Sequence, residues 1–188
     1  LREELVEMQR ALGITFLFVT HDQEEAMSVG TKMCIMEKGC IKQSGTPADL
    51  YERPESSFVA TFLGEINCLS GSVEQKTGNL VILSLGDNGK IQFVSKSTDT
   101  KEQRCYVRPE KVYFDSGQEQ KDPVNSLEGT LISMDFFGNY TRYQIKLKDG
   151  THFKISLQHR KSKQHQYSIG ESVRVLFAVS DVFQINEN

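Results

Sequence analysis

A single histidine, His21, stands where an apolar run ends and a polar helical pattern begins. The run 16–19, Phe-Leu-Phe-Val, has no polar residue in alternation, which is typical of a strand buried on both faces in a helix-covered parallel sheet. Ligands of open α/β sheets bind beyond the carboxyl ends of the strands, which is where His21 stands. An imidazole titrates near neutral pH and has two distinct nitrogens. The position therefore predicts chemistry, although a lone histidine at the end of an element is more often structural.

The polar residues around His21 predict the start of a helix. Thr20 with Gln23, or Asp22 with Glu25, has the spacing of a capping box, in which a short oxygen-bearing side chain caps a backbone N–H. A cap does not require an imidazole. We therefore expect Asp22 to be structural and keep His21 as the candidate functional residue.

The elements that would position His21 form an α/β pattern that lacks its first strands. Apolar residues at three- and four-residue spacing predict a helix over about 1–12, which Gly13 ends. A strand to Thr20 and a helix over about 22–30 follow. Two short strands, 33–37 and 40–44, flank a Lys-Gly turn, and two more helices begin at Thr46 and near residue 55.

From Cys68 onward the pattern changes to short strands separated by turn residues. Asp87-Asn88-Gly89 and Asp149-Gly150 are strong hairpin signals, because these residue types tolerate positive φ. Regular short strands with such turns predict a small barrel. The predicted strands cover 69–75, 80–85, 90–94, 104–108, 112–114, 126–136, 140–147, 151–156 and 172–177.

Composition agrees with a soluble protein of one ordinary domain, or of one small domain and a remnant. The 188 residues are 38% hydrophobic and 25% charged, with a net charge of −3, and this lack of a basic excess argues against a general nucleic-acid binder. Residues 1–64 hold 6 Lys and Arg against 10 Asp and Glu, a net charge of −4; the remaining 16 and 15 give +1. No stretch approaches the roughly 18 apolar residues of a membrane helix, and no leader opens the chain.

The four cysteines show no pattern of a metal site or of a disulfide framework. Cys34, Cys40, Cys68 and Cys105 stand far apart, with no C-x-x-C pair among them. Because buried free cysteine behaves as a small hydrophobe, we expect all four to be reduced packing residues.

The longer string around His21 resembles a known family. Val19-Thr20-His21-Asp22-Gln23-Glu24-Glu25-Ala26-Met27, followed by Gly45-Thr46-Pro47 and 58–64, is similar to the end of the ATPase subunit of ABC import transporters. Gly64-Glu65-Ile66-Asn67 and Val107-Arg108-Pro109-Glu110 look most like the spermidine/putrescine importer. The family usually has an aspartate close to Thr31, which this chain lacks. The barrel region resembles the family's accessory TOBE domain, which is OB-like.

The resemblance implies that His21 is the switch histidine, which contacts the γ-phosphate of ATP and helps to hold the attacking water. Phosphoryl transfer depends on positioning and on stabilising charge, so His21 would be a positioner and not a nucleophile. The sequence has no G-x-x-x-x-G-K-[ST] loop, no Leu-Ser-Gly-Gly-Gln signature and no apolar strand ending in Asp-Glu. We therefore expect this chain to be a carboxyl-terminal fragment. The full-length protein would hydrolyse ATP with Mg²⁺, and the fragment alone would bind neither ATP nor Mg²⁺.

The predicted fold class is an α/β remnant of an ABC nucleotide-binding domain, residues 1–64, followed by an OB-like TOBE barrel, residues 65–188. The resemblance also implies a homodimer of ATPase subunits, transmembrane permease partners, and a cytoplasmic location on the inner face of the membrane. No nucleic acid, metal site or direct membrane insertion is expected. Because a parallel-sheet remnant without its neighbours exposes an apolar edge, we expect the fragment to associate or to pack residues 1–20 differently.

The alternative is a non-enzymatic regulatory or small-ligand-binding module built on the barrel. OB-type barrels bind ligands through aromatic and basic residues on one face. Phe136, Phe137, Tyr140 and Tyr143 cluster with Arg142, and the run 158–165 is basic. We favour packing as the role of the aromatic residues and a solvated connection as the role of the basic run. For Arg108 we favour a structural ion pair. The sequence upstream of Leu1 would discriminate the two functions.

Overall fold

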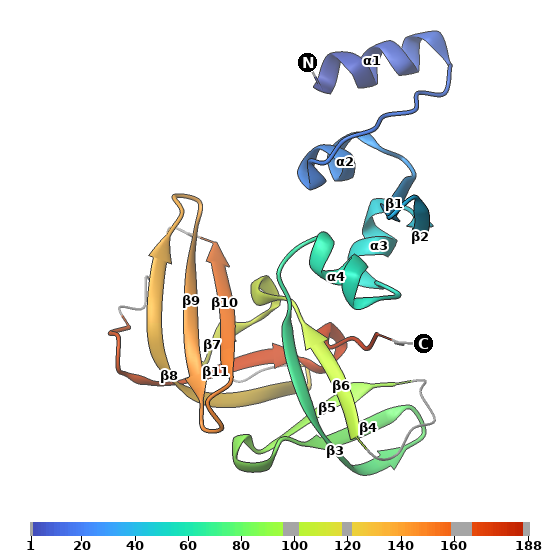
Figure 1. Cartoon of the computed structure of the whole chain (residues 1–188). Helices are drawn as coiled ribbons and strands as arrows, with labels where there is room; N and C mark the ends of the chain where they lie inside the picture. The colour runs from blue at the N-terminus through green and yellow to red at the C-terminus, as the bar shows by residue number, and fades with distance from the viewer. Residues whose placement is uncertain (1, 96–101, 118–121, 159–166, 186–188) are drawn as a thin grey trace. The chain divides into compact units, whose positions relative to one another are not determined.

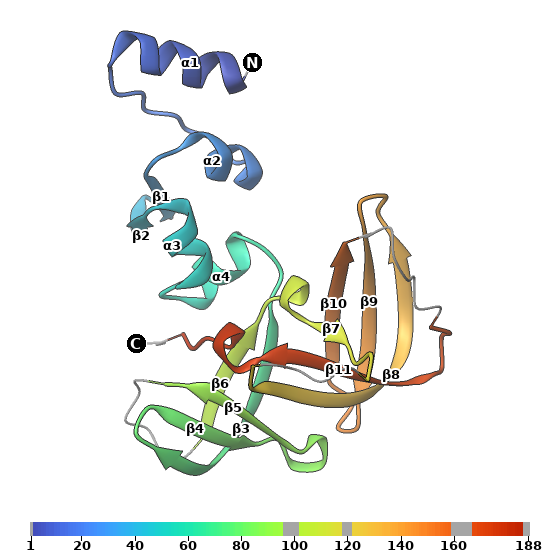
Figure 2. The same cartoon turned by 180° about the vertical axis from the view of Figure 1, so that it is seen from behind.

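The computed structural model describes residues 2–95, 102–117, 122–158 and 167–185, so the basic run predicted to be a solvated connection lies almost entirely outside the described residues. The chain divides into two compact units, Leu1–Gly64 and Glu65–Ile185. Figure 1 shows helices in the first unit and strands throughout the second, and Figure 2 gives the reverse view. Within the described residues, no helix has the length and apolar character needed to cross a membrane.

In its described residues the first unit consists of four helices and one β-hairpin. Its small apolar core consists of Met33, Ile35, Leu50, Val59 and Leu63. Thr46 and Ser56 accept hydrogen bonds from the backbone N–H groups three residues on and so cap the last two helices. The elements are α1 (Arg2–Leu12), α2 (Gln23–Val29), β1 (Met33–Glu37), β2 (Cys40–Gly45), α3 (Pro47–Glu52) and α4 (Ser57–Phe62).

The predicted strand ending at Thr20 is wrong for this structure. Residues 14–20 form neither helix nor strand, and Leu17 and Val19 are 93% and 88% exposed. A strand is stabilised by hydrogen bonds to a neighbouring strand, and within the described part of this unit only β1 and β2 pair, with each other. An apolar run that is suited to the middle of a parallel sheet therefore stays unpaired here.

The second unit consists of two antiparallel sheets. One has the order β10-β9-β8-β11-β7 and the other the order β5-β4-β3-β6. β8 pairs with β11 over its first part and with β9 over its second, and Figure 1 shows it bending between them. The strands are β3 (Asn67–Thr77), β4 (Leu80–Ser84), β5 (Lys90–Val94), β6 (Glu102–Val107), β7 (Tyr113–Phe114), β8 (Val124–Phe136), β9 (Tyr140–Leu147), β10 (His152–Gln158) and β11 (Ser172–Ala178).

The strands of the second unit form where alternating apolar residues predicted them. In β5, for example, Ile91 and Phe93 are fully buried while Lys90, Gln92 and Val94 face outward. The inward residues of both sheets form one continuous apolar core. The three 3₁₀ turns are η1 (Gly86–Asn88), η2 (Pro109–Lys111) and η3 (Val179–Asp181). The predicted OB-like β-rich architecture is confirmed.

One five-residue motif occurs twice in the second unit. Asn67-Cys68-Leu69-Ser70-Gly71 opens β3, and Asn125-Ser126-Leu127-Glu128-Gly129 lies at the start of β8. Each motif is followed by a strand irregularity at the same distance, between 73 and 75 and between 131 and 133. We call residues 67–114 the first half and residues 125–184 the second half.

The two halves exchange their last residues. Tyr113 and Phe114 of the first half pair with Leu176 and Val175 of β11. In return, the backbone of Phe183 in the second half forms two hydrogen bonds with Tyr106 of β6, of 2.8 and 2.9 Å. Each half therefore completes the sheet of the other.

Three cysteines differ from the prediction that all four are packing residues. Cys34, Cys40 and Cys68 are exposed, and Cys105 is buried. In β1 the side chains of Met33 and Ile35 alternate inward, so that of Cys34 points outward. Burial raises the pKa of the Cys105 thiol to about 12, and the nearby Cys68 thiol adds to the shift. Cys105 is therefore a neutral packing residue.

Candidate functional site

His21 lies in the exposed connection that leads into α2. Of the two predicted capping pairs, the second forms: Asp22 accepts a hydrogen bond of 2.9 Å from the backbone N–H of Glu25. Thr20 accepts from the backbone N–H of Asp22 and donates its hydroxyl to a carboxylate oxygen of Glu25 at 2.8 Å. Both neighbours of His21 are therefore used to begin the helix, and the imidazole itself is exposed.

An exposed imidazole can donate one directed hydrogen bond to an anionic ligand. The described residues contain no group of three or more His, Cys, Asp or Glu side chains placed to hold a metal ion. The sequence supplies no phosphate-binding loop. The structure therefore shows His21 as an exposed side chain at the start of α2, and its contact with a phosphate stays a prediction.

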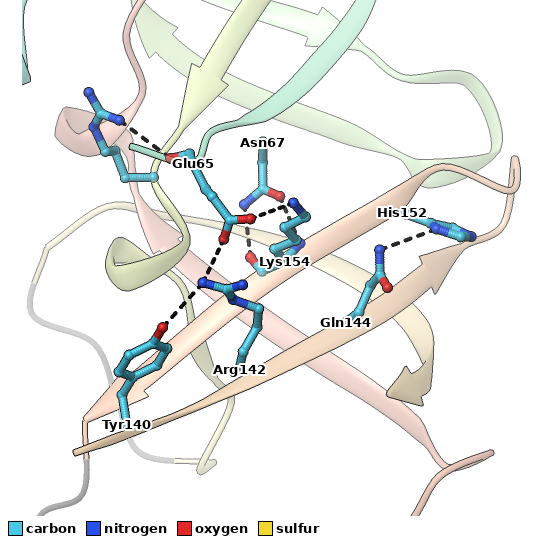
Figure 3. Close-up of polar contacts among 8 residues, drawn as sticks. Glu65, Asn67, Tyr140, Arg142, Gln144, His152 and Lys154 are labelled. Atoms are coloured by element: carbon cyan, nitrogen blue, oxygen red, sulfur yellow. Dashed lines mark hydrogen bonds and ion pairs between the residues drawn. The ribbon is translucent and has the colours of Figure 1, made fainter. Parts of the chain in front are cut away.

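A cluster of charged and polar side chains in the second unit lies where the chain enters β3 (Figure 3). The Glu65 carboxylate forms one ion pair with Arg142 of β9, at 3.0 Å, and another with Lys154 of β10, at 2.8 Å. Arg142 also donates to the Tyr140 hydroxyl at 3.3 Å. These charged side chains are 31% to 38% exposed, so solvent reaches the cluster.

Beside this cluster, Asn67 joins the two sheets. Its side-chain amide donates to the Lys154 carbonyl at 2.8 Å and accepts from the Lys154 N–H at 2.7 Å. Asn67 is 3% exposed, so both bonds are shielded from water. Arg108, equally buried, donates from Nη1 to the Glu65 carbonyl at 3.4 Å. We call Glu65, Asn67, Arg108, Arg142 and Lys154 the Asn67 joint.

The second half contains an equivalent joint without the charges. Asn125, 4% exposed, donates to the Gln92 carbonyl at 2.8 Å and accepts from the Gln92 N–H at 2.6 Å. The Pro123 carbonyl accepts from the Val179 N–H at 3.1 Å. We call Asn125, Gln92, Pro123 and Val179 the Asn125 joint. By the repeat, Glu65 corresponds to Pro123 and Lys154 to Gln92.

The difference between the two joints explains why Arg108 donates to the Glu65 carbonyl. The residue that corresponds to Val179 in the first half is Pro109, which has no backbone N–H to donate. The Arg108 guanidinium donates instead to the Glu65 carbonyl, and it lies 5.9 Å from the centroid of the Phe183 ring. Arg108 therefore has a structural role in the fold.

The predicted aromatic cluster divides into buried and exposed members. Tyr143 packs edge-on against Phe114, with ring centroids 5.1 Å apart, as part of the barrel interior. Phe136 and Phe137 are 72% and 50% exposed. Phe137 stacks on Tyr140 at 4.9 Å, and the Arg142 guanidinium lies 5.0 Å from the Phe137 ring centroid. Tyr143 therefore belongs to the barrel interior and Phe137 and Tyr140 stack within the hairpin, as the packing interpretation predicts, while Phe136 is mostly exposed.

Neither joint was predicted from the sequence motifs. The repeated Asn-x-Leu-x-Gly string could have revealed them, because each asparagine opens its motif at the position where a buried amide is needed. Nothing local marks the partners of Glu65, which lie 77 and 89 residues further on at Arg142 and Lys154.

Comparisons with known proteins define the class of this fold. A family model described as a TOBE domain matches residues 105–184. The structure of a cytoplasmic molybdate-binding protein, ModG, superimposes with a TM-score of 0.54 at 21% sequence identity and covers 63% of this chain and 95% of that one. At that identity the likeness concerns the fold alone. The second unit is an OB-like barrel that contains a TOBE domain.

Sequence relatives extend the match over nearly the whole chain. A spermidine/putrescine import ATP-binding protein, PotA, of Ruegeria pomeroyi is 35% identical over 93% of this chain and 46% of its own length. The PotA proteins of Thermobifida fusca and Pseudomonas fluorescens are 34% and 32% identical over 90% and 94% of this chain. The chain spans about half the length of these curated relatives. The predicted resemblance to ATP-binding subunits of ABC importers, with a TOBE domain, is confirmed.

Proposed function

We propose that this chain is the carboxyl-terminal part of the energy-coupling ATP-binding subunit of an ABC importer for polyamines. The observation that carries the proposal is the similarity to spermidine/putrescine import ATP-binding proteins over 93% of the chain. The TOBE domain match and the string around His21 support it. On this proposal residues 1–64 belong to the ATPase domain and residues 65–188 to a regulatory or dimerisation domain.

His21 is the proposed contact to the γ-phosphate. An imidazole N–H would stabilise charge that develops on the phosphate oxygens during transfer, and it would help to position the attacking water. The exposure of His21, and the use of both neighbouring residues as helix caps, are consistent with this role. ATP and Mg²⁺ would be held chiefly by residues beyond the chain described here.

The remaining parts of the proposal concern assembly. Two ATP-binding subunits would form a homodimer, and transmembrane permease subunits would anchor them at the cytoplasmic face of the membrane. The exposed apolar run 14–20 is suited to the interior of the ATPase domain in the whole subunit, because a continuous apolar strand is normally covered on both faces. Strands from the remainder of the polypeptide would cover it.

The test is ATP hydrolysis by the full-length protein with His21→Ala beside the wild type. Loss of a directed donor to the transition state should lower kcat by about 100-fold or more, with a much smaller change in KM for ATP. His152→Ala is the matched control, because His152 is exposed on β10 and hydrogen-bonds to Gln144. Equal turnover of His21→Ala and wild type, or no nucleotide binding by the full-length protein, would reject the proposal.

One observation favours the alternative of a regulatory or small-ligand-binding module. Phe136 and Phe137 expose aromatic surface at the tip of the β8–β9 hairpin, whereas residues 77–79 at the equivalent β3–β4 turn are Thr-Gly-Asn. A ligand-binding barrel would lose its ligand in a Phe136→Ser, Phe137→Ser double variant while ATP turnover of the full-length protein stayed unchanged.

A further inference from the structure

The residues on either side of His21 are joined by a closed set of hydrogen bonds. The Thr20 hydroxyl oxygen accepts from the Asp22 backbone N–H at 3.0 Å, across His21. The same hydroxyl donates its proton to Glu25 Oε2 at 2.8 Å. Asp22 Oδ1 accepts from the Glu25 backbone N–H at 2.9 Å. We call Thr20, Asp22 and Glu25 the His21 clamp, because together they hold the backbone before and after the imidazole.

The Glu25 side chain does more in this clamp than a helix start requires. The cap on α2 uses the backbone N–H of Glu25, and the side chain takes no part in that bond. In a capping box the side chain three residues on accepts from the N–H of the capping residue. Here the Asp22 N–H donates to Thr20 instead, and the Glu25 carboxylate accepts from the Thr20 hydroxyl. The carboxylate therefore holds the residue before His21, outside the helix.

The direction of the bonds explains why an acceptor is needed at Glu25. A hydroxyl group has a single proton to donate, and an ionised carboxylate can only accept. The carboxylate therefore fixes the rotation of the Thr20 hydroxyl, whose lone pair then faces the Asp22 N–H. A hydrogen bond to a charged acceptor is about twice as strong as one between neutral groups. Loss of the carboxylate would release Thr20 and, with it, the bond across His21.

The backbone of His21 is thus held while its side chain stays exposed. Residues 14–20 form neither helix nor strand, so the clamp restrains Thr20 without any help from a sheet. Precise orientation matters for a directed hydrogen-bond donor, because a misplacement of about 1 Å can lower the rate about 100-fold.

We propose that Glu25 is a positioning residue for His21 in ATP hydrolysis. The inference rests on the proposed function, in which the imidazole contacts the γ-phosphate. Glu25 contacts neither the nucleotide nor the attacking water, and it acts through Thr20. Without the carboxylate, the backbone at His21 rotates more freely, and the imidazole N–H points at the phosphate for a smaller share of the time.

The first arm of the test measures the clamp itself in the 188-residue chain, by ¹⁵N relaxation. In the wild type, the amides of His21 and Asp22 should have order parameters of about 0.85, and in Glu25→Ala these should fall below about 0.6. Glu24→Ala is the matched control, because Glu24 is an exposed carboxylate in the same first turn of α2. It should leave both order parameters unchanged.

The second arm measures ATP hydrolysis by the full-length protein. Glu25→Ala and Thr20→Val should each lower kcat about tenfold and change KM for ATP less than about twofold. Thr20→Ser and Glu25→Gln keep the hydroxyl and an acceptor oxygen, so they should recover most of the lost turnover. In a His21→Ala background, Glu25→Ala should change kcat less than about twofold, since both act through the same contact.

The two arms separate failure of this inference from failure of the proposed function. Unchanged order parameters in Glu25→Ala overturn the inference, whatever His21 does. If His21→Ala lowers kcat and Glu25→Ala does not, or if Glu24→Ala lowers it equally, Glu25 is no positioning residue. An additive loss in the His21→Ala background also overturns the inference. If His21→Ala leaves kcat unchanged, the proposed function fails, and the positioning role falls with it even where the clamp is observed.

Discussion

The Asn67 joint and the Asn125 joint both connect the two sheets through a buried asparagine, but the residues around the asparagine differ. In each, a buried asparagine forms two hydrogen bonds with the backbone of a strand in the other sheet. Around Asn67 the neighbours are Glu65, Arg142 and Lys154, and around Asn125 they include Pro123 and Gln92. The two asparagine amide bonds are common to both joints, whereas the ion pairs occur at the Asn67 joint, where the residues that correspond to Glu65 and Lys154 in the Asn125 joint are the uncharged Pro123 and Gln92.

The largest expected effect concerns the glycine that ends each repeated motif. A Cβ at Gly71 would overlap the Ser84 carbonyl oxygen, whereas one at Gly129 would lie 2.8 Å from the Lys146 carbonyl oxygen. We predict that Gly71→Ala lowers the free energy of unfolding by about 3 kcal/mol and Gly129→Ala by about 1 kcal/mol, because overpacking forces the backbone apart. Urea denaturation measures both. Equal losses would mean that the halves are packed alike at this point.

The second largest expected effect is the loss of stability when either buried asparagine, Asn67 or Asn125, is replaced. Asn67→Ala and Asn125→Ala each leave a partly buried backbone N–H and a partly buried carbonyl without the asparagine partner, which costs about 2 kcal/mol. We expect the two variants to lose the same free energy of unfolding within about 0.5 kcal/mol. Thermal and urea unfolding of both variants provide the comparison. A much smaller loss at Asn67 would show that the surrounding ion pairs hold that joint without the amide.

The smallest effect at neutral pH concerns Cys105, whose counterpart in the second half is Val175. Both are fully buried and lie opposite the leucine of the motif, Leu69 or Leu127. We predict that Cys105→Val changes the free energy of unfolding at pH 7 by less than about 1 kcal/mol, because the volumes are similar.

The Cys105→Val variant should also lack one part of the pH dependence that the free energy of unfolding of the wild type has at alkaline pH. The pKa of Cys105 is about 12 in the folded chain, against an ordinary value of 9.0. The unfolded chain therefore releases the thiol proton first as pH rises. The contribution of this thiol to the free energy of unfolding is fully present below pH 9 and decreases between pH 9 and pH 12. Urea denaturation of wild type and Cys105→Val in reducing buffer measures this difference, and parallel curves would contradict the prediction.

Local patterns were enough to predict most of the barrel. Residues 90–94 alternate in polarity, and Asp149-Gly150 marks a tight turn, so β5 and the β9–β10 hairpin could be placed from their own residues. Thr46 followed by Pro47 likewise predicted the start of α3. In each of these cases the physical cause lies within a few residues of the element.

The errors arose where the cause is distant or depends on phase. The run 14–20 was predicted as a strand from its apolar character, but a strand needs a neighbour to pair with. Cys34 and Cys68 have apolar neighbours, yet strand alternation points them outward. The partners of Glu65 could not be predicted, since no local pattern links residues so far apart. The role of His21 stays a prediction.

The exchange of end segments between the two halves has a consequence for how the barrel can be divided. A polypeptide that stops after Phe114 would carry β7 without β11, and its Tyr106 backbone would have no Phe183 to bind. A polypeptide that starts at Pro123 would lack β7 in the same way. We therefore expect that neither piece folds alone, and that the two pieces, produced separately and mixed, assemble by mutual complementation.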